Sequence, residues 1–154
     1  MENSVEDQDP EIIKLFSQCL EAKEFSYSPY SHFRVGCALL AQNGSIFQGC
    51  NVENVSYGLS ICAERTAIVK AVSSGCRKFK AIAVTTDLED EFASPCGNCR
   101  QFMAEFGLDY EIYLVRKDLQ FVKTTVSELL PKAFTPETLA MAKVQNQTAV
   151  TNSS

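Results

Sequence analysis

The chain has 154 residues and a net charge of −5, and 45% of its residues are hydrophobic, which fits a single globular domain with a substantial core. An acidic chain without a Lys/Arg run repels a phosphate backbone, so this composition disfavours a nucleic-acid partner. No stretch approaches the roughly 18 apolar residues of a transmembrane helix, so we expect no membrane partner. The acidic start lacks the apolar core of a signal peptide. We therefore expect a cytoplasmic protein with reduced cysteines, with nuclear entry left open.

The chain opens with an acidic segment, residues 1–9, that we expect to be flexible. Asp9-Pro10 then suits the start of a helix, because Asp caps helices and Pro fits their first turn. Apolar residues follow at helical spacing and predict a face turned towards the core. They are Ile12, Ile13, Phe16, Cys19 and Leu20.

Five strands are predicted. A Ser/Pro/Tyr loop at 26–31 leads into a hairpin with strands at 34–41 and 45–51, joined by a tight turn at Asn43-Gly44. Later strands are expected at 79–86, 110–115 and 120–125. The strand at 79–86 is apolar enough to be central in the sheet, and 120–125 is expected at an edge.

Two further helices are predicted between these strands. One begins at Cys62 and is closed near Gly75, and the other begins at Pro95-Cys96, runs to Phe106 and stops at Gly107. The alternation of strand and helix predicts an α/β fold with a largely parallel sheet and helices on both faces. Ligands of such folds bind beyond the carboxyl ends of the strands, where both helices would begin. We expect one domain, 10–140, and a flexible tail, 141–154.

Three cysteines and one glutamate form the most informative motif. Glu64 lies two residues after Cys62, and Cys96 and Cys99 are one helical turn apart. Three thiolates leave the fourth position of a tetrahedral zinc ion open for a water molecule, whose pKa falls to about 7. Glu64 could then move the protons of that water. The order ligand-x-Glu followed by Pro-Cys-x-x-Cys is a known signature of zinc deaminases.

Helix N-termini lower the pKa of thiols, and all three cysteines are expected there. Three thiolates on one zinc ion leave a net charge of about −1, which weakens its effect on water. Arg65 is the candidate that tunes this thiolate charge, with Arg100 as a second nearby cation.

Other interpretations of the motif stay open at this point. Cys-x-x-Cys also occurs in redox dithiols, and Glu64 could be an ordinary residue of a first helical turn. A structural zinc site would need a fourth protein ligand. The candidates for that ligand are Cys19, Cys37, Cys50, Cys76 and His32.

The motif segments 62–67 and 94–101 resemble the cytidine deaminases, specifically the small homotetrameric, vertebrate-like class with three cysteines on zinc. The resemblance covers about residues 10–140 and includes segments 27–33, 35–40, 49–54 and 128–131. It departs mildly at Cys37 and Asn98, where small residues such as Ala are frequent.

The resemblance implies a three-layer α/β/α fold with a mixed five-stranded sheet. It also implies one Zn²⁺ per subunit, bound by Cys62, Cys96 and Cys99. The implied reaction is hydrolytic deamination of cytidine and 2′-deoxycytidine to uridine and 2′-deoxyuridine plus ammonia, a step of pyrimidine salvage. In it, zinc-bound hydroxide attacks C4 and Glu64 shuttles protons.

The resemblance also implies substrate-binding roles. Asn51 and Glu53 would bind the ribose, and the carboxylate of Glu53 can accept from a sugar hydroxyl. Phe33 would pack on the base, and backbone carbonyls near Ala63 and Ser94 would orient the amine.

Two aromatic residues, Tyr57 and Phe134, are candidates for crossing between the subunits of a homotetramer with shared sites, and Tyr30 is a further position near the site mouth. The residues alone favour other interpretations for two aromatics, with Phe33 in the core and Phe134 packed on its own domain.

Two alternative functions make distinct predictions. A polynucleotide cytidine deaminase would have a basic groove and strongly salt-dependent binding. A zinc-stabilised binding module would retain zinc and show no reaction.

Overall fold

The computed structural model describes residues 3, 5–141 and 143–144, so the predicted flexible residues 1, 2, 4, 142 and 145–154 lie outside the described part. The elements in chain order are η1 (Val5–Asp7), α1 (Pro10–Lys23), β1 (Val35–Ala41), β2 (Ile46–Cys50), η2 (Tyr57–Leu59), α2 (Ala63–Ser73), β3 (Phe79–Thr86), α3 (Gly97–Ala104), β4 (Glu111–Val115), β5 (Phe121–Thr125), α4 (Val126–Leu129) and α5 (Pro136–Ala140). None of the helices in this described part has the length and apolar character required to cross a membrane.

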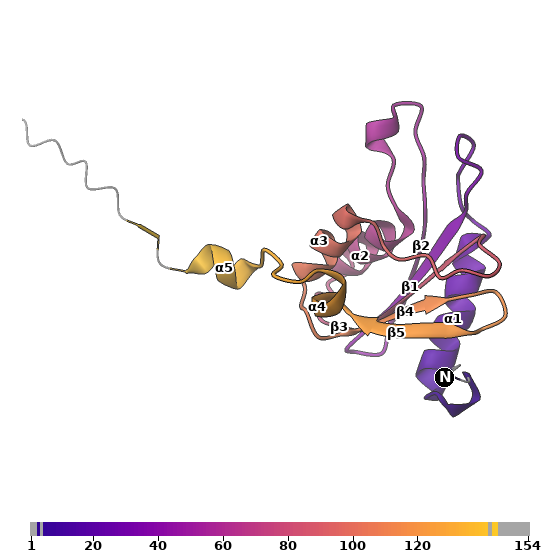
Figure 1. Ribbon diagram of the computed structural model, residues 1–154, viewed down its shortest axis with the longest axis horizontal. Coiled ribbons are helices and arrows are strands. Elements are labelled where there is room, and N and C mark those ends of the chain that lie inside the picture. Colours follow the sequence, from indigo (N-terminus) through magenta and orange to yellow (C-terminus); the bar gives the residue numbers. More distant parts are fainter. Residues whose placement is uncertain (1–2, 4, 142, 145–154) are drawn as a thin grey trace, which may run out of the picture.

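The five strands form one mixed sheet in the order β2-β1-β3-β4-β5 (Figure 1). The predicted central strand, β3, and the predicted edge strand, β5, are both confirmed. The expectation of a largely parallel sheet was wrong, because of the four described pairings only β3–β4 is parallel. Short turns force the β1–β2 and β4–β5 hairpins to be antiparallel. The connection through α2 then places β3 beside β1 instead of β2, and β1 runs in the opposite direction.

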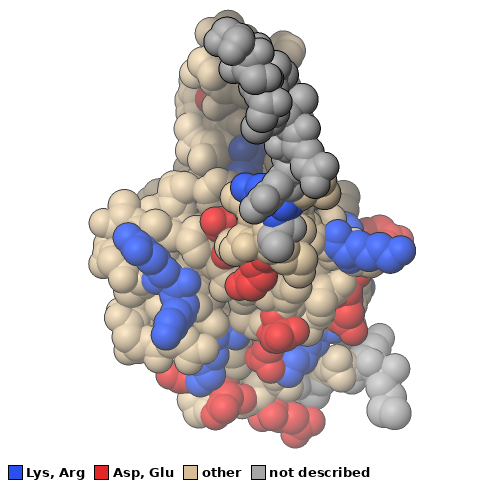
Figure 2. All heavy atoms as spheres, turned by 90° about the vertical axis from the view of Figure 1, so that its left-hand side faces the viewer, with Lys and Arg blue, Asp and Glu red and all other residues tan. Residues whose placement is uncertain are grey.

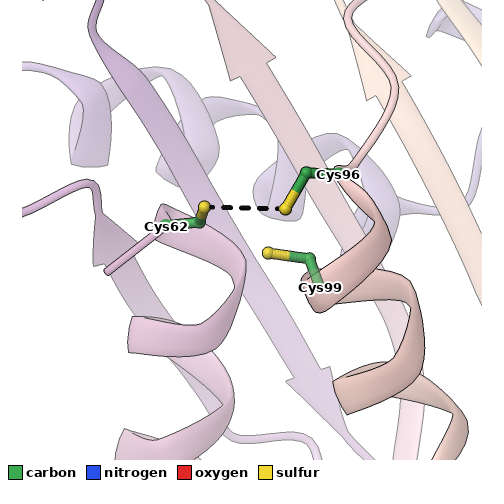
Figure 3. Close-up of side chains that lie close together, drawn as sticks. All are labelled: Cys62, Cys96 and Cys99. Carbon is green, nitrogen blue, oxygen red and sulfur yellow. Dashed lines mark hydrogen bonds between the residues drawn. The ribbon is translucent and has the colours of Figure 1, made fainter. Parts of the chain in front are cut away.

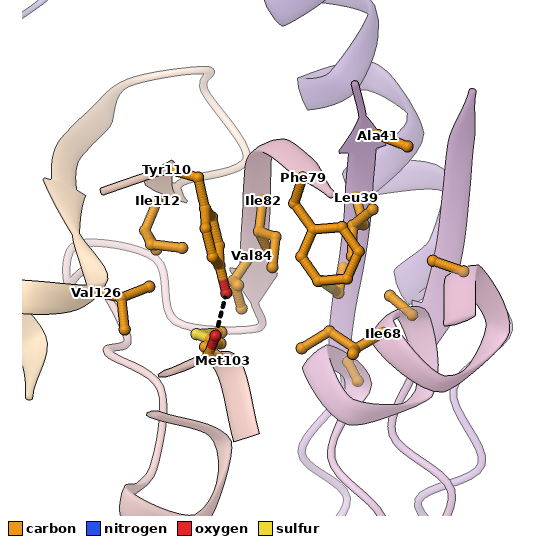
Figure 4. Packing of buried hydrophobic residues seen from close by; sticks show 14 of the residues in the cluster. Leu39, Ala41, Ile68, Phe79, Ile82, Val84, Met103, Tyr110, Ile112 and Val126 are labelled. Atoms are coloured by element: carbon orange, nitrogen blue, oxygen red, sulfur yellow. Dashed lines mark hydrogen bonds between the residues drawn. The ribbon is translucent and has the colours of Figure 1, made fainter. Parts of the chain in front are cut away.

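Helices cover both faces of the sheet, which confirms the predicted three layers. Helix α1 packs on one face with Phe16, Tyr113 and Phe121 in mutual ring contact. Helices α2 and α3 cover the other face, where Ile68 and Met103 join the larger core cluster (Figure 4). Residues of β1 alternate between the two clusters, because successive side chains of a strand point to opposite faces.

Two glycines allow the helices to approach the sheet closely. A Cβ atom on Gly36 would lie 2.4 Å from the carbonyl oxygen of Cys19 in α1, and one on Gly49 would lie 2.5 Å from that of Ala63 in α2. Since real Cβ atoms are not found at such distances, both positions require glycine. Gly49 therefore allows the N-terminus of α2, with its functional residues, to lie directly on β2.

Helix α3 ends two residues earlier than predicted. Its carbonyl at Met103 accepts from the backbone N–H of Phe106 at 3.1 Å and from the hydroxyl of Tyr110 at 2.8 Å. The tight turn and the tertiary hydrogen bond stop the helix before Gly107, which adopts φ +136°.

Candidate active site

The three predicted zinc ligands lie together between two helix N-termini (Figure 3). Cys62 caps α2, Cys96 caps α3, and Cys99 lies in the first turn of α3. Their sulfur atoms all lie within 4.8 Å of one another, and those of Cys62 and Cys96 are 3.8 Å apart. The side chains from the two helices point towards a common point in Figure 3.

This donor set fits a zinc ion. With Zn–S bonds of about 2.3 Å, the sulfur atoms of a tetrahedral site are about 3.8 Å apart. Within the described part of the chain, no His, Asp, Glu or further Cys joins the cluster, so the fourth ligand of a structural zinc site is not supplied there. A three-ligand site of this kind leaves one position for water or substrate.

Arg65 provides positive charge beside the thiols. Its Nη2 lies 3.5 Å from the sulfur of Cys62. The pKa of the Cys62 thiol is lowered to about 5, first by its hydrogen bond with Cys99 and then by Arg65. Both effects favour a thiolate, which is the form that binds metal.

The other candidate cation, Arg100, has a different position. Its guanidinium donates to the backbone oxygens of Pro95 at 2.7 Å and Leu129 at 2.6 Å, and to the Oγ of Ser94 at 2.7 Å. These bonds tie the loop before α3 to the end of α4. Arg100 therefore holds the loop that carries Cys96.

Glu64 is buried in the first turn of α2, with 5% of its surface exposed. Its pKa is raised to about 7, chiefly by burial and further by the negative charge of Cys62. A carboxyl group with this pKa can both take up and release a proton near neutral pH. The position and the pKa together suit a proton shuttle.

A cavity of about 350 Å³ joins these groups, and its volume lies in the range of small-molecule sites. Val84 and Thr86 line it at the carboxyl end of β3. Seven of the predicted site residues also line it: Phe33, Asn51, Glu53, Cys62, Glu64, Ser94 and Cys96. The cavity therefore brings together residues from five separate segments between residues 31 and 96.

Phe33 forms part of the cavity wall and is 37% exposed. The interpretation of Phe33 as a core residue, which the sequence alone favoured, was wrong. Phe33 follows a turn in which His32 has φ +54°, and this turn directs the chain into β1.

The side-chain amide of Asn51 is largely committed to the protein. Its Oδ1 accepts from Ser26 Oγ at 2.5 Å and from the N–H of Val35 at 2.9 Å, and its Nδ2 donates to the oxygen of Phe33 at 2.8 Å. An amide has two acceptor sites and two donor hydrogens. One N–H of Asn51 thus remains beyond these three bonds.

Glu53 accepts three hydrogen bonds from the loop before Phe33. Oε1 accepts from the N–H groups of Tyr30 at 3.0 Å and Ser31 at 3.1 Å, and Oε2 accepts from Ser31 Oγ at 2.5 Å. These bonds, led by the Ser31 hydroxyl, lower the pKa of Glu53. Glu53 therefore stays ionised at neutral pH.

The two predicted cross-subunit residues do not reach this cavity. Tyr57 is 73% exposed and stacks edge-on against Tyr30, with ring centroids 5.6 Å apart. Both tyrosines line an adjoining cavity that shares Ser31, Glu53 and Ser60 with the first.

Phe134 is 58% exposed and lines neither cavity, and its backbone oxygen accepts from Gln101 Nε2 at 2.9 Å. Three further predicted site residues do not line the cavity: Ala63, Arg65 and Cys99. Of these, Ala63 is fully buried.

The sequence interpretation assigned no role to Ser31, which contacts both Glu53 and Phe33. Ser31 lies in segment 27–33, but a serine in a polar loop carries no signal of its partners. Asp87, which accepts from Arg34 and lies 3.3 Å from Lys23, was also missed.

The comparisons with known proteins agree with this geometry. A model of the "Cytidine and deoxycytidylate deaminase zinc-binding region" matches residues 10–115. A probable cytidine deaminase of Dictyostelium discoideum is 48% identical over 89% of this chain and 92% of its own length. A cytidine deaminase of Sporosarcina psychrophila is also 48% identical, over 88% of this chain and 99% of its own. The crystal structure of cytidine deaminase from Burkholderia pseudomallei superposes with a TM-score of 0.76, at 44% identity over 79% of this chain and 98% of that one.

Proposed function

This chain belongs to the cytidine and deoxycytidylate deaminase family, and from that premise we propose that it hydrolyses cytidine and 2′-deoxycytidine to uridine and 2′-deoxyuridine with release of ammonia. The observation that carries the proposal is the single cavity lined by Cys62, Cys96 and the buried carboxyl group of Glu64. A metal-ligand cluster and a proton-transfer group thus face the same space.

In this proposal Cys62, Cys96 and Cys99 hold one zinc ion per chain. Zinc, when bound, lowers the pKa of a coordinated water molecule and so supplies a nucleophile at neutral pH. Arg65 offsets part of the negative charge of the three thiolates. That positive charge counteracts the negative charge of the three thiolates, which would otherwise make zinc less effective at lowering the pKa of its water.

Glu64 moves the protons of the reaction. Its carboxylate accepts a proton from the attacking water and delivers it to N3 of the ring, which makes C4 electron-poor. As the C4–O bond forms and the C4–N bond breaks, Glu64 transfers the second proton of the water to the leaving amine, which departs as ammonia. Burial of Glu64 allows one group to act as base and then as acid.

The remaining cavity residues bind the nucleoside. Phe33 packs on the base, Glu53 accepts from a sugar hydroxyl, and Asn51 donates through its remaining N–H. Backbone carbonyls at Ala63 and Ser94 orient the exocyclic amine. The two carboxyl groups that line the cavity, Glu53 and Glu64, favour an uncharged nucleoside over a phosphorylated one.

We also propose a homotetramer in which Tyr57 and Phe134 contribute to the sites of neighbouring subunits. Large apolar side chains that are more than half exposed support this assembly, because such exposure marks interaction surfaces. They are Phe25, Tyr27, Val55, Tyr57, Leu59, Phe134, Leu139, Met141 and Val144. In Figure 1 the segments before β1 and before α2 extend beyond the same end of the sheet.

The proposal includes a catalytic domain of residues 10–140, a cytoplasmic location and a role in pyrimidine salvage. Helix α1 begins at Pro10 and α5 ends at Ala140, which supports these domain limits.

The test follows the loss of cytidine absorbance and the zinc content of the purified chain. We expect turnover in the parent protein. In Glu64→Gln we expect zinc to be retained and kcat to fall by at least about 10²–10⁴-fold, because acid–base catalysis is lost. Glu105→Gln changes an exposed glutamate at the C-terminal end of α3 and serves as the matched control, for which we expect an unchanged kcat. No turnover in a zinc-loaded parent would contradict the proposal and favour the binding module.

A polynucleotide substrate has less support. On the face drawn in Figure 2, Lys and Arg are interspersed with Asp and Glu and form no continuous basic tract. The net charge of −5 also disfavours binding of a polyanionic nucleic acid. Turnover of single-stranded DNA or RNA in preference to cytidine would reverse this conclusion.

A further inference from the structure

The loop between α1 and β1 is folded around the carboxylate of Glu53. Both oxygens of this side chain are held by neighbouring groups, with backbone N–H groups of Tyr30 and Ser31 on Oε1 and the hydroxyl of Ser31 on Oε2. Ser31 is the residue that contacts both oxygens. The orientation of the carboxylate therefore depends on Ser31 more than on Tyr30, which contacts one oxygen alone.

Counting acceptor sites shows which oxygen remains open. A carboxylate offers about four lone-pair sites. The two N–H donors occupy both sites of Oε1, and the Ser31 hydroxyl occupies one of the two on Oε2. One further donor can be accepted, and it must bind to the oxygen that Ser31 holds.

The same hydroxyl also contacts the chain beside the aromatic wall. The backbone N–H of Phe33 donates to Ser31 Oγ at 3.1 Å, so the single hydroxyl hydrogen is left for Glu53. Ser31, Phe33 and Glu53 all line the cavity that contains Glu64. One hydroxyl group thus links the acceptor for the sugar to the residue beside the base.

We propose that Ser31 is a positioning residue for the substrate, whose hydroxyl orients Oε2 of Glu53 towards the 2′- or 3′-hydroxyl of the nucleoside sugar and so sets nucleoside affinity. This inference rests on the proposed function, since it assigns the sugar of the substrate to Glu53. Ser31 acts through Glu53 and takes no part in the chemistry at C4.

The test is a cycle of two variants and two substrates. Ser31→Ala is expected to raise KM for cytidine about tenfold, the lower range for a hydrogen bond to a charged group, with kcat within about twofold of the parent. For 2′,3′-dideoxycytidine, which lacks the 2′- and 3′-hydroxyls and keeps the 5′-hydroxyl, the parent and Ser31→Ala are expected to have the same KM within about twofold. Ser31→Thr retains the hydroxyl and is expected to restore KM for cytidine.

Controls separate positioning from folding. Ser17→Ala removes an exposed hydroxyl of α1 that bonds only the local carbonyl of Lys14 among its described partners, and no kinetic change is expected. Zinc content and the thermal unfolding midpoint are measured for every variant. Should Ser31→Ala fail to fold, Ser31→Cys keeps the size and a weak donor, and an intermediate KM is expected.

The inference is overturned if Ser31→Ala raises KM equally for both nucleosides, leaves KM unchanged, or lowers kcat alone. The same cycle is run as equilibrium binding in a Glu64→Gln background, where no turnover interferes. A parent that fails to deaminate cytidine would contradict the proposed function. Equal losses of affinity for the two nucleosides would contradict the role of Ser31 alone.

Discussion

Arg65 lies beside the three-cysteine cluster without belonging to it. Its guanidinium lies beside Cys62, and it provides a cation that can offset the charge of three thiolates. We expect Arg65→Gln to keep zinc and to lower kcat roughly tenfold, which corresponds to about 1.4 kcal/mol of transition-state stabilisation. Kinetics with zinc analysis checks this, with exposed Arg77→Gln as the control. An Arg65→Gln protein with the kcat of the parent would show that the helix N-termini supply enough positive potential.

At the scale of the secondary-structure elements, the close contact between α2 and β2 sets the position of Cys62 and Glu64 relative to the sheet. Because a Cβ on Gly49 would lie 2.5 Å from the backbone of α2, Gly49→Ala must push the helix away. We expect a loss of about 1–3 kcal/mol in the free energy of unfolding, measured by urea denaturation, with lower zinc content. Gly58 has no atom within 4 Å of a Cβ position, so Gly58→Ala is the control with little change. Equal stability of the two variants would contradict the close contact.

The ends of α1 and β3 are joined through Asp87, which pairs with Lys23 and Arg34. The hydrogen bond from Arg34 leads the effects that lower the pKa of Asp87 from 3.8 to about 2. A depressed pKa stabilises the folded state above the unfolded pKa of 3.8, and this contribution is lost as the pH falls through about 2.

At pH 7, we therefore expect Asp87→Asn to lower the free energy of unfolding by about 1–2 kcal/mol, after allowance for solvent screening of this partly exposed group. The gap between the parent and the variant should shrink between pH 4 and pH 2, as measured by denaturation at each pH. A gap that is constant over this range would show that the ion pairs contribute nothing.

At the scale of the whole molecule, activity should depend on assembly. If Tyr57 and Phe134 complete neighbouring sites, specific activity should fall on dilution as the tetramer dissociates, and Phe134→Ala should raise KM. Light scattering coupled to gel filtration gives the mass, expected at four chains. A monomer with full activity at every concentration would contradict shared sites.

The two halves of the cysteine motif and the positions of the strands could be predicted because each depends on short-range spacing. Cys62, Glu64, Cys96 and Cys99 lie at helix starts, and the nearly continuous run of apolar residues in 79–86 marks a central strand. Such patterns extend over a few residues and do not depend on contacts between distant parts of the chain.

Strand direction, exposure and the sharing of hydrogen bonds depend instead on contacts between distant segments. The single parallel pairing among the described strands follows from where β3 lies relative to β1. Phe33, whose backbone is hydrogen-bonded to Ser31 and Asn51, lines a cavity that also contains two of the thiols, Cys62 and Cys96. The one acceptor site left on Glu53 follows from donors about twenty residues earlier in the chain, and only the folded arrangement of these groups decides which atoms remain free to bind a substrate.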